Sequence, residues 1–242
     1  MEAPRSLRTL SVDIGGTGIK TLVLDEKGKP VTERLRVATP RPATPRAVIP
    51  AIVKLAQQQG NFDRVSVGFP GVVRKGVTET AWNLGKSWIG FDLDRAMTKA
   101  LGKPVRTCND ADVQGLGVVK GKGVELVITL GTGFGSSLFL DGRLVPNMQL
   151  AHHAAWRDRT YEDELGQKAL KKAGKKKWNR RLLKAIGSLE ALFNYDMLYI
   201  GGGNTQKIDV ELPRRVKIVE NVAGLLGGIA LWKGQEGRYG VD

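Results

Sequence analysis

Two glycine-rich hairpins that repeat at a constant offset limit what this chain can fold into more than any other feature. Segment 13–17 (DIGGT) lies over segment 129–133 (TLGTG), and segment 22–25 (LVLD) lies over segment 138–141 (LFLD). Each copy predicts a strand, a glycine turn, a second strand and an acidic turn. Such a repeat indicates a duplicated architecture. The identities are few, so a chance similarity of two hairpins stays open as the alternative.

Strand and helix patterns alternate through the rest of the chain, which indicates an α/β protein. A length of 242 residues suits one large or two small domains. Further strands are expected at 30–37, 64–68, 105–108 and 197–200, and helices at 47–59, 93–101, 111–119, 161–173, 179–194 and 216–232.

The composition is that of an ordinary water-soluble globular protein, with 41% hydrophobic and 26% charged residues. No apolar stretch approaches the roughly 20 residues that a membrane span needs, and the first residues lack the apolar core of a signal peptide. The single cysteine, Cys108, excludes an internal disulfide and a cysteine-cluster zinc site. We therefore expect a cytoplasmic protein without membrane partners.

The net charge of +14 is the one unusual bulk property. It favours a polyanionic partner such as nucleic acid, polyphosphate or an anionic surface. A basic protein whose charge serves only solubility explains the number equally well.

The two glycine turns predict a phosphate-binding function. A phosphate chain must approach the backbone closely, and glycine leaves room for it while free N–H groups form an anion nest. Asp13 precedes the first turn, where its carboxylate would hold Mg²⁺ through water. The alternative for Lys20 is an exposed strand lysine. The predicted phosphate-binding residues are Asp13, Gly15, Gly16, Thr17, Lys20, Gly131, Thr132 and Gly133.

Asn109 and Asp110 lie where a short strand gives way to a helix. A carboxylate at such a junction points into a cleft and is suited to take a proton from a substrate hydroxyl. An ordinary helix N-cap is the competing interpretation, and spacing alone favours it.

Several motifs together resemble the ROK family of sugar kinases and repressors, with matching order along nearly the whole chain. They are DIGGTGIK from Asp13, GFPGVV from Gly68, NDAD from Asn109, GTGFGSSLFLDGRLVPN from Gly131 and YIGGGNT from Tyr199. The resemblance implies a two-lobed, actin-like ATPase fold (a duplicated ribonuclease H-like fold). We expect a small lobe over 1–108, a large lobe over 109–228, and a C-terminal helix over 229–242 that packs back on the small lobe.

The stretches GFGSSLFLDGRLVPN, KKWNRR and LFNYDMLYIGGGNT are most similar to the members that phosphorylate glucose from inorganic polyphosphate, often with ATP as well. The resemblance implies that Asp110 is the catalytic base, that Mg²⁺ is the cofactor, and that the protein is a homodimer. It also implies that Gly202 and Gly203 bind nucleotide. The implied sugar-binding residues are Asn83, Asn109, Gln149, His152 and Glu162.

One motif departs from the family pattern. The family's glutamate and glycine before the histidine are replaced by Gln149 and Ala151, while His152 is retained. Glutamine offers one acceptor oxygen where glutamate offers two, so hexose binding should be weakened or retuned. Because the family's zinc-binding cysteines are absent, His152 is expected to contact sugar, and we predict no protein-held metal cluster.

The densest charge lies in KKAGKKKWNRRLLK, from Lys171 to Lys184. A solvated helix face is the usual interpretation of such a run. A polyphosphate track, interrupted by a bend at Gly174, would explain it too, because a long polyanion binds through many charge contacts. The residues of the predicted track are Lys171, Lys172, Lys175, Lys176, Lys177, Arg180 and Arg181.

Three rival functions deserve a test. A repressor of the same family needs a helix-turn-helix before the first hairpin, and only a dozen residues precede Asp13. A sugar-binding protein with weak catalysis is suggested by Gln149 and opposed by Asp110. A nucleic-acid-binding protein is not expected, because no recognised nucleic-acid motif accompanies the charge.

Overall fold

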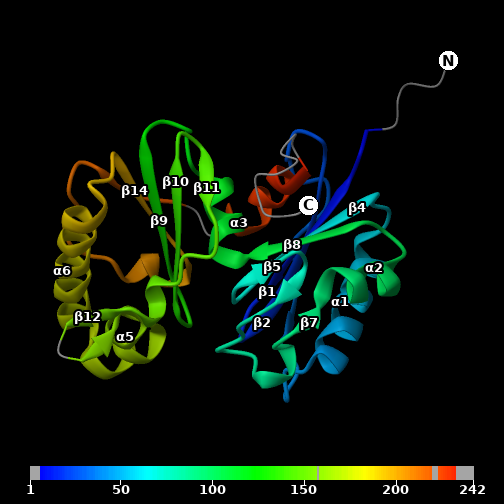
Figure 1. The fold of residues 1–242 in the computed structure, drawn as a ribbon, viewed down its shortest axis with the longest axis horizontal. Helices are drawn as coiled ribbons and strands as arrows, with labels where there is room; N and C mark the ends of the chain where they lie inside the picture. Colours follow the sequence, from blue (N-terminus) through cyan, green and yellow to red (C-terminus); the bar gives the residue numbers. More distant parts are fainter. Residues whose placement is uncertain (1–5, 157, 220–222, 233–242) are drawn as a thin grey trace. The chain divides into compact units, whose positions relative to one another are not determined.

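The computed structural model describes residues 6–156, 158–219 and 223–232, and these divide into two compact units (Figure 1). The divisions fall between Gly117 and Val118 and between Ala223 and Gly224. The first unit therefore extends beyond the boundary expected at residue 108, because the helix that begins at Asp110 packs on the sheet of that unit.

The first unit is built on a five-stranded sheet of order β3-β2-β1-β4-β8. Strand β1 pairs antiparallel with β2 and parallel with β4. Its strands and helices are β1 (Thr9–Ile14), β2 (Gly18–Leu24), β3 (Leu35–Ala38), α1 (Pro45–Gln59), β4 (Arg64–Phe69), β5 (Val73–Arg74), β6 (Val77–Thr78), η1 (Lys86–Trp88), β7 (Phe91–Asp92), α2 (Leu93–Leu101), β8 (Val105–Asn109), α3 (Asp110–Leu116), α7 (Ala223–Leu226) and η4 (Gly227–Trp232).

Side chains alternate between the two faces of this sheet, as strand geometry requires. Leu10 and Val12 enter an apolar core with Ile52 of α1 and Met97 of α2. Between them, Ser11 faces the other side, where its hydroxyl donates to the carbonyl oxygen of Leu225 at 2.7 Å. The chain near the C-terminus thus returns to the first unit and covers the second face of its sheet, together with α3.

The second unit repeats the plan with a five-stranded sheet of order β11-β10-β9-β14-β15. Helix α6 is amphipathic and buries Trp178, Leu182 and Leu189 in the core beneath this sheet. The elements are β9 (Val124–Leu130), β10 (Phe134–Leu140), β11 (Arg143–Val145), η2 (Leu150–His152), β12 (Ala154–Trp156), β13 (Arg159–Thr160), α4 (Tyr161–Leu165), α5 (Gln167–Ala173), α6 (Lys175–Phe193), β14 (Met197–Gly201), η3 (Gly203–Lys207) and β15 (Val216–Ile218).

The duplication expected from the two hairpins is confirmed. In both sheets the first strand pairs antiparallel with the second and parallel with a later strand, and the order of strands is the same. The second hairpin strands, Gly18–Leu24 and Phe134–Leu140, match at both ends under the offset found in the sequence.

Some local expectations were wrong at the ends of elements. The helix expected over 216–232 is instead strand β15, followed after residues 220–222 by the short α7 and the 3-10 helix η4. Val216–Ile218 takes the parallel position beside β14, because an edge strand there completes the sheet. Of the C-terminal helix expected over 229–242, residues up to Trp232 form η4, and the remainder lies outside the described residues.

The tryptophan at the end of the described chain fixes this return. The guanidinium groups of Arg64 and Arg106 both lie over the Trp232 ring, at 5.1 and 4.5 Å from the ring centroid. Its indole N–H donates to the hydroxyl of Ser66 at 2.8 Å.

Across the ranges that the structure describes, no helix carries an apolar stretch sufficient to cross a lipid bilayer.

Candidate active site

A row of charged residues crosses the first sheet at the end of β1. Asp13 on β1 lies opposite Lys20 on β2, and Lys20 lies opposite Arg36 on β3. Residues opposite each other in a ladder project from the same face. The Lys20 ammonium donates to a carboxylate oxygen of Asp13 at 2.6 Å. Lys20, which the sequence assigned to phosphate, is thus paired with a carboxylate in this structure.

On the other side of Asp13 the row continues to Gly68 on β4. A side chain at Gly68 would place its Cβ 3.4 Å from the Cα of Asp110. The missing side chain therefore leaves room for the first residue of α3 to lie beside Asp13. In this way Asp110 and Asp13, which are far apart in the sequence, come close enough to influence each other's charge.

This environment changes the acidity of the Asp110 carboxyl. Burial raises its pKa to about 7, and the nearby charge of Asp13 acts in the same direction. The backbone N–H of Ala111, which donates to Asp110 at 2.8 Å, and the charge of Lys20 act against the rise. A carboxyl group with a pKa near neutrality is suited to exchange a proton with a substrate.

Asn109 is the N-cap of α3. The alternative interpretation of Asp110 as an ordinary helix cap is therefore not needed. The side-chain oxygen of Asn109 accepts from the backbone N–H groups of Ala111 and Asp112 at 3.0 and 3.2 Å. Its side-chain nitrogen donates to the carbonyl oxygen of Gly71 at 3.0 Å. The buried Asn109 amide thus joins the end of β8 to the turn that follows β4. Its expected sugar contact stays a prediction.

The first glycine turn follows β1, the strand that carries Asp13. The backbone N–H of Gly15 donates to the carbonyl of Gly18 at 3.0 Å, and a Cβ at Gly15 would lie 2.8 Å from that oxygen. The turn therefore needs glycine at this position. Asn83 lies beside it, since a Cβ at Gly16 would be 3.4 Å from the Cβ of Asn83. The structure thus brings the predicted sugar residue Asn83 next to the predicted phosphate residues of this unit.

Three side chains that the sequence did not single out hold the carbonyl groups of this turn. The Thr39 hydroxyl donates to the Gly15 carbonyl at 2.5 Å, and Arg41 Nη2 donates to the Gly16 carbonyl at 2.7 Å. Arg36 Nη2 donates to the Thr17 carbonyl at 3.4 Å. The stretch from Pro40 was expected only as a proline-rich loop, and nothing in its local pattern predicts that it folds against a turn more than twenty residues earlier.

The second glycine turn is held by neutral groups. The Gly131 carbonyl accepts from the backbone N–H of Gln167 at 3.0 Å and from the side-chain nitrogen of Asn204 at 3.1 Å. Asn204 lies in the 3-10 helix η3, whose N-cap is Gly202 with a φ of 93°. Gly202, Gly203 and the turn 131–133 are therefore neighbours in the second unit, as a shared phosphate or nucleotide site requires.

The predicted sugar residues of the second unit lie on two adjoining short helices, α4 and η2. Glu162 on α4 accepts from the backbone N–H of Phe134 at 3.3 Å, directly after the second glycine turn. His152 ends η2. Hydrogen bonds from the backbone and side chain of Thr160 lower the pKa of the nearby Asp163, and Arg159 and His152 act in the same direction. Gln149 precedes η2 and is partly buried. The structure thus groups Gln149, His152 and Glu162.

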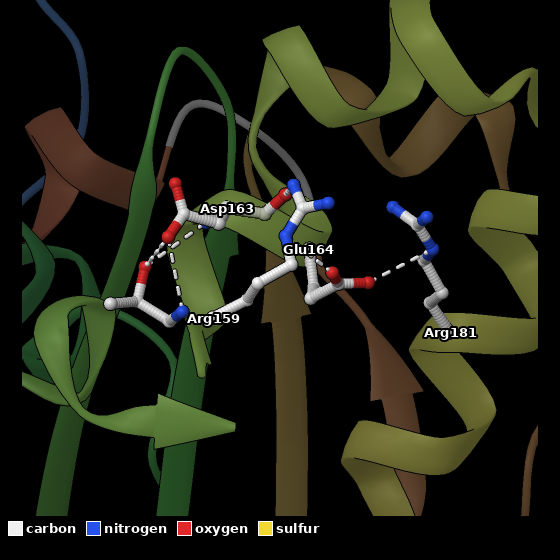
Figure 2. A network of polar contacts seen from close by, with 5 residues as sticks. Arg159, Asp163, Glu164 and Arg181 are labelled. Carbon is white, nitrogen blue, oxygen red and sulfur yellow. Dashed lines mark hydrogen bonds and ion pairs between the residues drawn. The ribbon is translucent and has the colours of Figure 1, made fainter. Parts of the chain in front are cut away.

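A buried ion cluster fixes α4 to its surroundings (Figure 2). The Glu164 side chain is only 3% exposed, and Arg159 Nε and Arg181 Nε contact its two carboxylate oxygens at 2.8 and 2.9 Å. Arg159 also donates to the carbonyl oxygen of Asp163 at 2.8 Å. Arg181, which was assigned to the polyphosphate track, is therefore engaged in holding α6 against the helix that carries Glu162.

The other members of the basic run lie on α5 and on the first turns of α6. Gly174, with a φ of 75°, separates the two helices, so the expected bend is confirmed. Lys171, Lys172, Lys176, Lys177 and Arg180 are exposed. Lys175 is also exposed and pairs with Asp209 at 2.8 Å. Lysines at a helix N-terminus are repelled by the positive end of the helix dipole. A bound anion there would offset this repulsion.

Within residues 6–156, 158–219 and 223–232, no group of three or more histidine, cysteine or carboxylate side chains is arranged so that it could hold a metal ion. Asp13 precedes the first glycine turn, and Asp110 lies over Gly68, the residue opposite Asp13 in the sheet. Hard carboxylate oxygens of this kind suit Mg²⁺ held partly through water.

The repeated sheets, each with a glycine turn after its first strand, define the class of actin-like ATPase folds. A model of the ROK family matches residues 9–153. The polyphosphate glucokinase of Mycobacterium tuberculosis is 32% identical over 237 residues, which cover 89% of this chain and 88% of that protein. The chain belongs to the ROK family.

Solved structures agree with this assignment. The inorganic polyphosphate/ATP-glucomannokinase from Arthrobacter sp. strain KM has a TM-score of 0.84 and 36% sequence identity, with 95% of this chain and 100% of that chain covered. A ROK family glucokinase from Streptomyces griseus, solved with glucose and AMPPNP, has a TM-score of 0.78 at 20% sequence identity. The match covers 93% of this chain and 98% of that chain. The latter supports the fold alone.

The buried cluster around Glu164 gives a stability prediction. Replacing Arg181 by Met should lower the free energy of unfolding by about 1.5–3 kcal/mol, because a buried carboxylate loses a charge-assisted hydrogen bond. Arg180→Met is the matched control, since Arg180 is exposed and adjacent; its effect should stay within about 0.5 kcal/mol. Urea unfolding measures both. Equal effects would show that Arg181 contributes no more than an ordinary surface arginine.

Proposed function

We propose that this protein is a hexose kinase that transfers a phosphoryl group from inorganic polyphosphate or ATP to the 6-hydroxyl of glucose or a related hexose. The observation that carries the proposal is the position of Asp110. Its carboxyl group, with a pKa of about 7, lies beside Asp13 and close to a glycine turn suited to phosphate. The family membership, the polyphosphate glucokinase of Mycobacterium tuberculosis and the glucomannokinase of Arthrobacter sp. strain KM support the same activity.

In the proposed reaction Asp110 accepts the proton of the sugar hydroxyl. The hydroxyl oxygen forms a bond to the terminal phosphorus, and the bond from that phosphorus to the bridging oxygen of the donor breaks. The leaving oxygen keeps the electron pair, so ADP or a shortened polyphosphate departs. The N–H groups of the turn after β1 would stabilise the charge on the transferred group.

Mg²⁺ is the proposed cofactor, and Asp13 is the residue placed to hold it through water. When bound, the ion would neutralise charge on the donor phosphates. Asp13 has a further role that needs no metal, because its negative charge helps to keep the Asp110 pKa high.

The proposed sugar contacts are Asn83 and Asn109 in the first unit and Gln149, His152 and Glu162 in the second. Gln149 is the weak point of this set, since an amide offers one acceptor oxygen where the family's glutamate offers two. For that reason a sugar-binding ROK protein with weak or altered kinase activity is the second candidate function. A kinase assay that crosses several hexoses with ATP and polyphosphate separates the two candidates.

Two further proposals concern the setting of the enzyme. The single cysteine, Cys108, needs no oxidising compartment, and we propose that the protein works in the cytoplasm. The family resemblance supports a homodimer, which sedimentation analysis can test.

The first prediction from the proposed function concerns the proposed base. Asp110→Asn should lower kcat by roughly 100- to 10,000-fold, because the amide cannot accept the proton, while sugar binding measured by calorimetry stays close to that of the parent. A near-normal kcat would remove Asp110 from the mechanism.

The second prediction concerns pH. A base with a pKa of about 7 is protonated below that pH, so kcat/KM should fall on the acid side of about pH 7. Asp13→Asn removes a negative charge that raises the Asp110 pKa, and it should move this limb to lower pH whatever its effect on the maximal rate. A limb that stays in place would mean that another group titrates.

The third prediction concerns the donor. Neutralising Lys175, Lys176 and Lys177 together should raise KM for long polyphosphate, leave KM for ATP nearly unchanged and flatten the salt dependence of the polyphosphate reaction. Asp209 must be replaced by Asn in the parent and in the variant, because Lys175 pairs with it. Small and equal effects on both donors would identify these lysines as a solvated helix face.

A further inference from the structure

Two arginines lie against the first glycine turn without a carboxylate partner among the ion pairs of the described residues. Arg36 lies at the end of the cross-strand row and Arg41 in the loop after β3. Both side chains are exposed. We propose that Arg36 and Arg41 form a binding site for the phosphate chain of the donor, next to the phosphoryl group held by the turn.

The charge row supplies the first argument. Lys20 and Arg36 are directly opposite each other, which places two positive side chains on neighbouring strands. Like charges in this arrangement are destabilising. Asp13 pairs with Lys20 at 2.6 Å, whereas among the described residues the Arg36 guanidinium donates to the neutral carbonyl of Thr17 and forms no ion pair. The positive charge that remains for an anion at this turn therefore belongs to the arginines and not to Lys20.

The second argument comes from the position of the guanidinium groups. A Cβ at Gly18 would lie 2.7 Å from Nε and Nη2 of Arg36, so this guanidinium lies directly over the end of the turn. Arg41 donates to the carbonyl of Gly16 at 2.7 Å through one nitrogen. A guanidinium has several N–H donors, and its fork geometry matches phosphate oxygens. Among the described residues each of these guanidinium groups makes one hydrogen bond, which leaves further donors for a ligand.

The repeat within the fold supplies an internal comparison. The equivalent turn of the second unit has its carbonyls held by the backbone of Gln167 and the amide of Asn204, both neutral. Holding the carbonyls of such a turn therefore does not require cations. Two arginines at the first turn add charge that the fold does not need, and charge of this sign is what a phosphate chain requires.

The arginines also orient the turn. When the carbonyl oxygens of Gly15, Gly16 and Thr17 are engaged by Thr39, Arg41 and Arg36, the intervening peptide N–H groups are directed away from those side chains. An anion nest depends on such an orientation. The same contacts thus prepare the turn for the phosphoryl group, while the arginine charges lie on the carbonyl side of the turn, where they would meet the rest of the phosphate chain.

The experiment compares Arg36→Gln/Arg41→Gln with Arg34→Gln/Arg46→Gln. The control removes the same charge from exposed arginines of the same stretch of chain. Binding of tripolyphosphate and of long polyphosphate is measured by calorimetry at several salt concentrations without sugar, and KM is measured for polyphosphate and for ATP.

We expect the Arg36/Arg41 variant to bind both polyphosphates at least about tenfold more weakly. The slope of log affinity against log salt should fall by roughly 1.4, for two lost phosphate contacts. The control should keep most of the parent's slope and affinity. An equal loss in both variants would show that only the net charge matters and would overturn the proposal.

Lysine replacements separate binding from support of the turn. Arg36→Lys/Arg41→Lys keeps the charge, so the salt slope should be retained while affinity falls less than in the glutamine variant. If the glutamine variant binds polyphosphate with an unchanged slope, the arginines only support the turn and the proposal is wrong. KM for ATP, whose phosphate chain is short, should rise less than KM for long polyphosphate.

The kinetic part of this inference rests on the proposed kinase function, whereas the binding part does not. If the parent protein phosphorylates no hexose from any donor, the proposed function fails. Polyphosphate binding that still depends on Arg36 and Arg41 would then support the site independently of catalysis.

Discussion

The arrangement of the first unit depends on the absence of a side chain at Gly68. In the cross-strand row this residue lies beside Asp13, and the space above it is taken by Asp110. A Cβ at this position would already touch the Cα of Asp110 at 3.4 Å, so a side chain longer than that of alanine would crowd the start of α3. Because Asp13 and Asp110 stay close, burial and the charge of Asp13 together bring the Asp110 pKa to about 7. The basicity that the proposed reaction requires is therefore a consequence of backbone packing.

The same row explains how charges are distributed around the turn. Asp13 lies between Lys20 and the space that Asp110 occupies, so one carboxylate both neutralises a lysine and perturbs an acid. Beyond Lys20, Arg36 extends the positive side of the row. The row thus runs from positive to negative across the sheet, with the cationic end beside the turn that would hold a phosphate and the acidic end beside the group that would accept a proton.

The second unit uses buried charge for a different purpose. Glu164 joins β13, α4 and α6 through two arginines, and the helix that it anchors also carries Glu162 (Figure 2). A buried carboxylate is tolerated only with such complete pairing. This constraint takes Arg181 out of the exposed basic run, although nothing in the run of lysines and arginines distinguishes it from Arg180. Helical position alone decides which of the two faces the core.

The sequence by itself determined the duplicated α/β fold and the two glycine turns, because these depend on local patterns that repeat along the chain. It indicated Asp110 as the candidate base only through the family resemblance, since spacing alone favoured a helix cap there. The bend at Gly174 was also predictable, since glycine there ends one helix and begins the next. The segment from Val216 was mistaken for a helix, because pairing with β14 overrides local preference at that position. Only the tertiary structure decided that Lys20 pairs with Asp13, that Asn109 and not Asp110 caps α3, and that Arg36 and Arg41 reach the first glycine turn. These contacts join strands and loops through register and packing, and no local pattern encodes which residues will lie opposite one another.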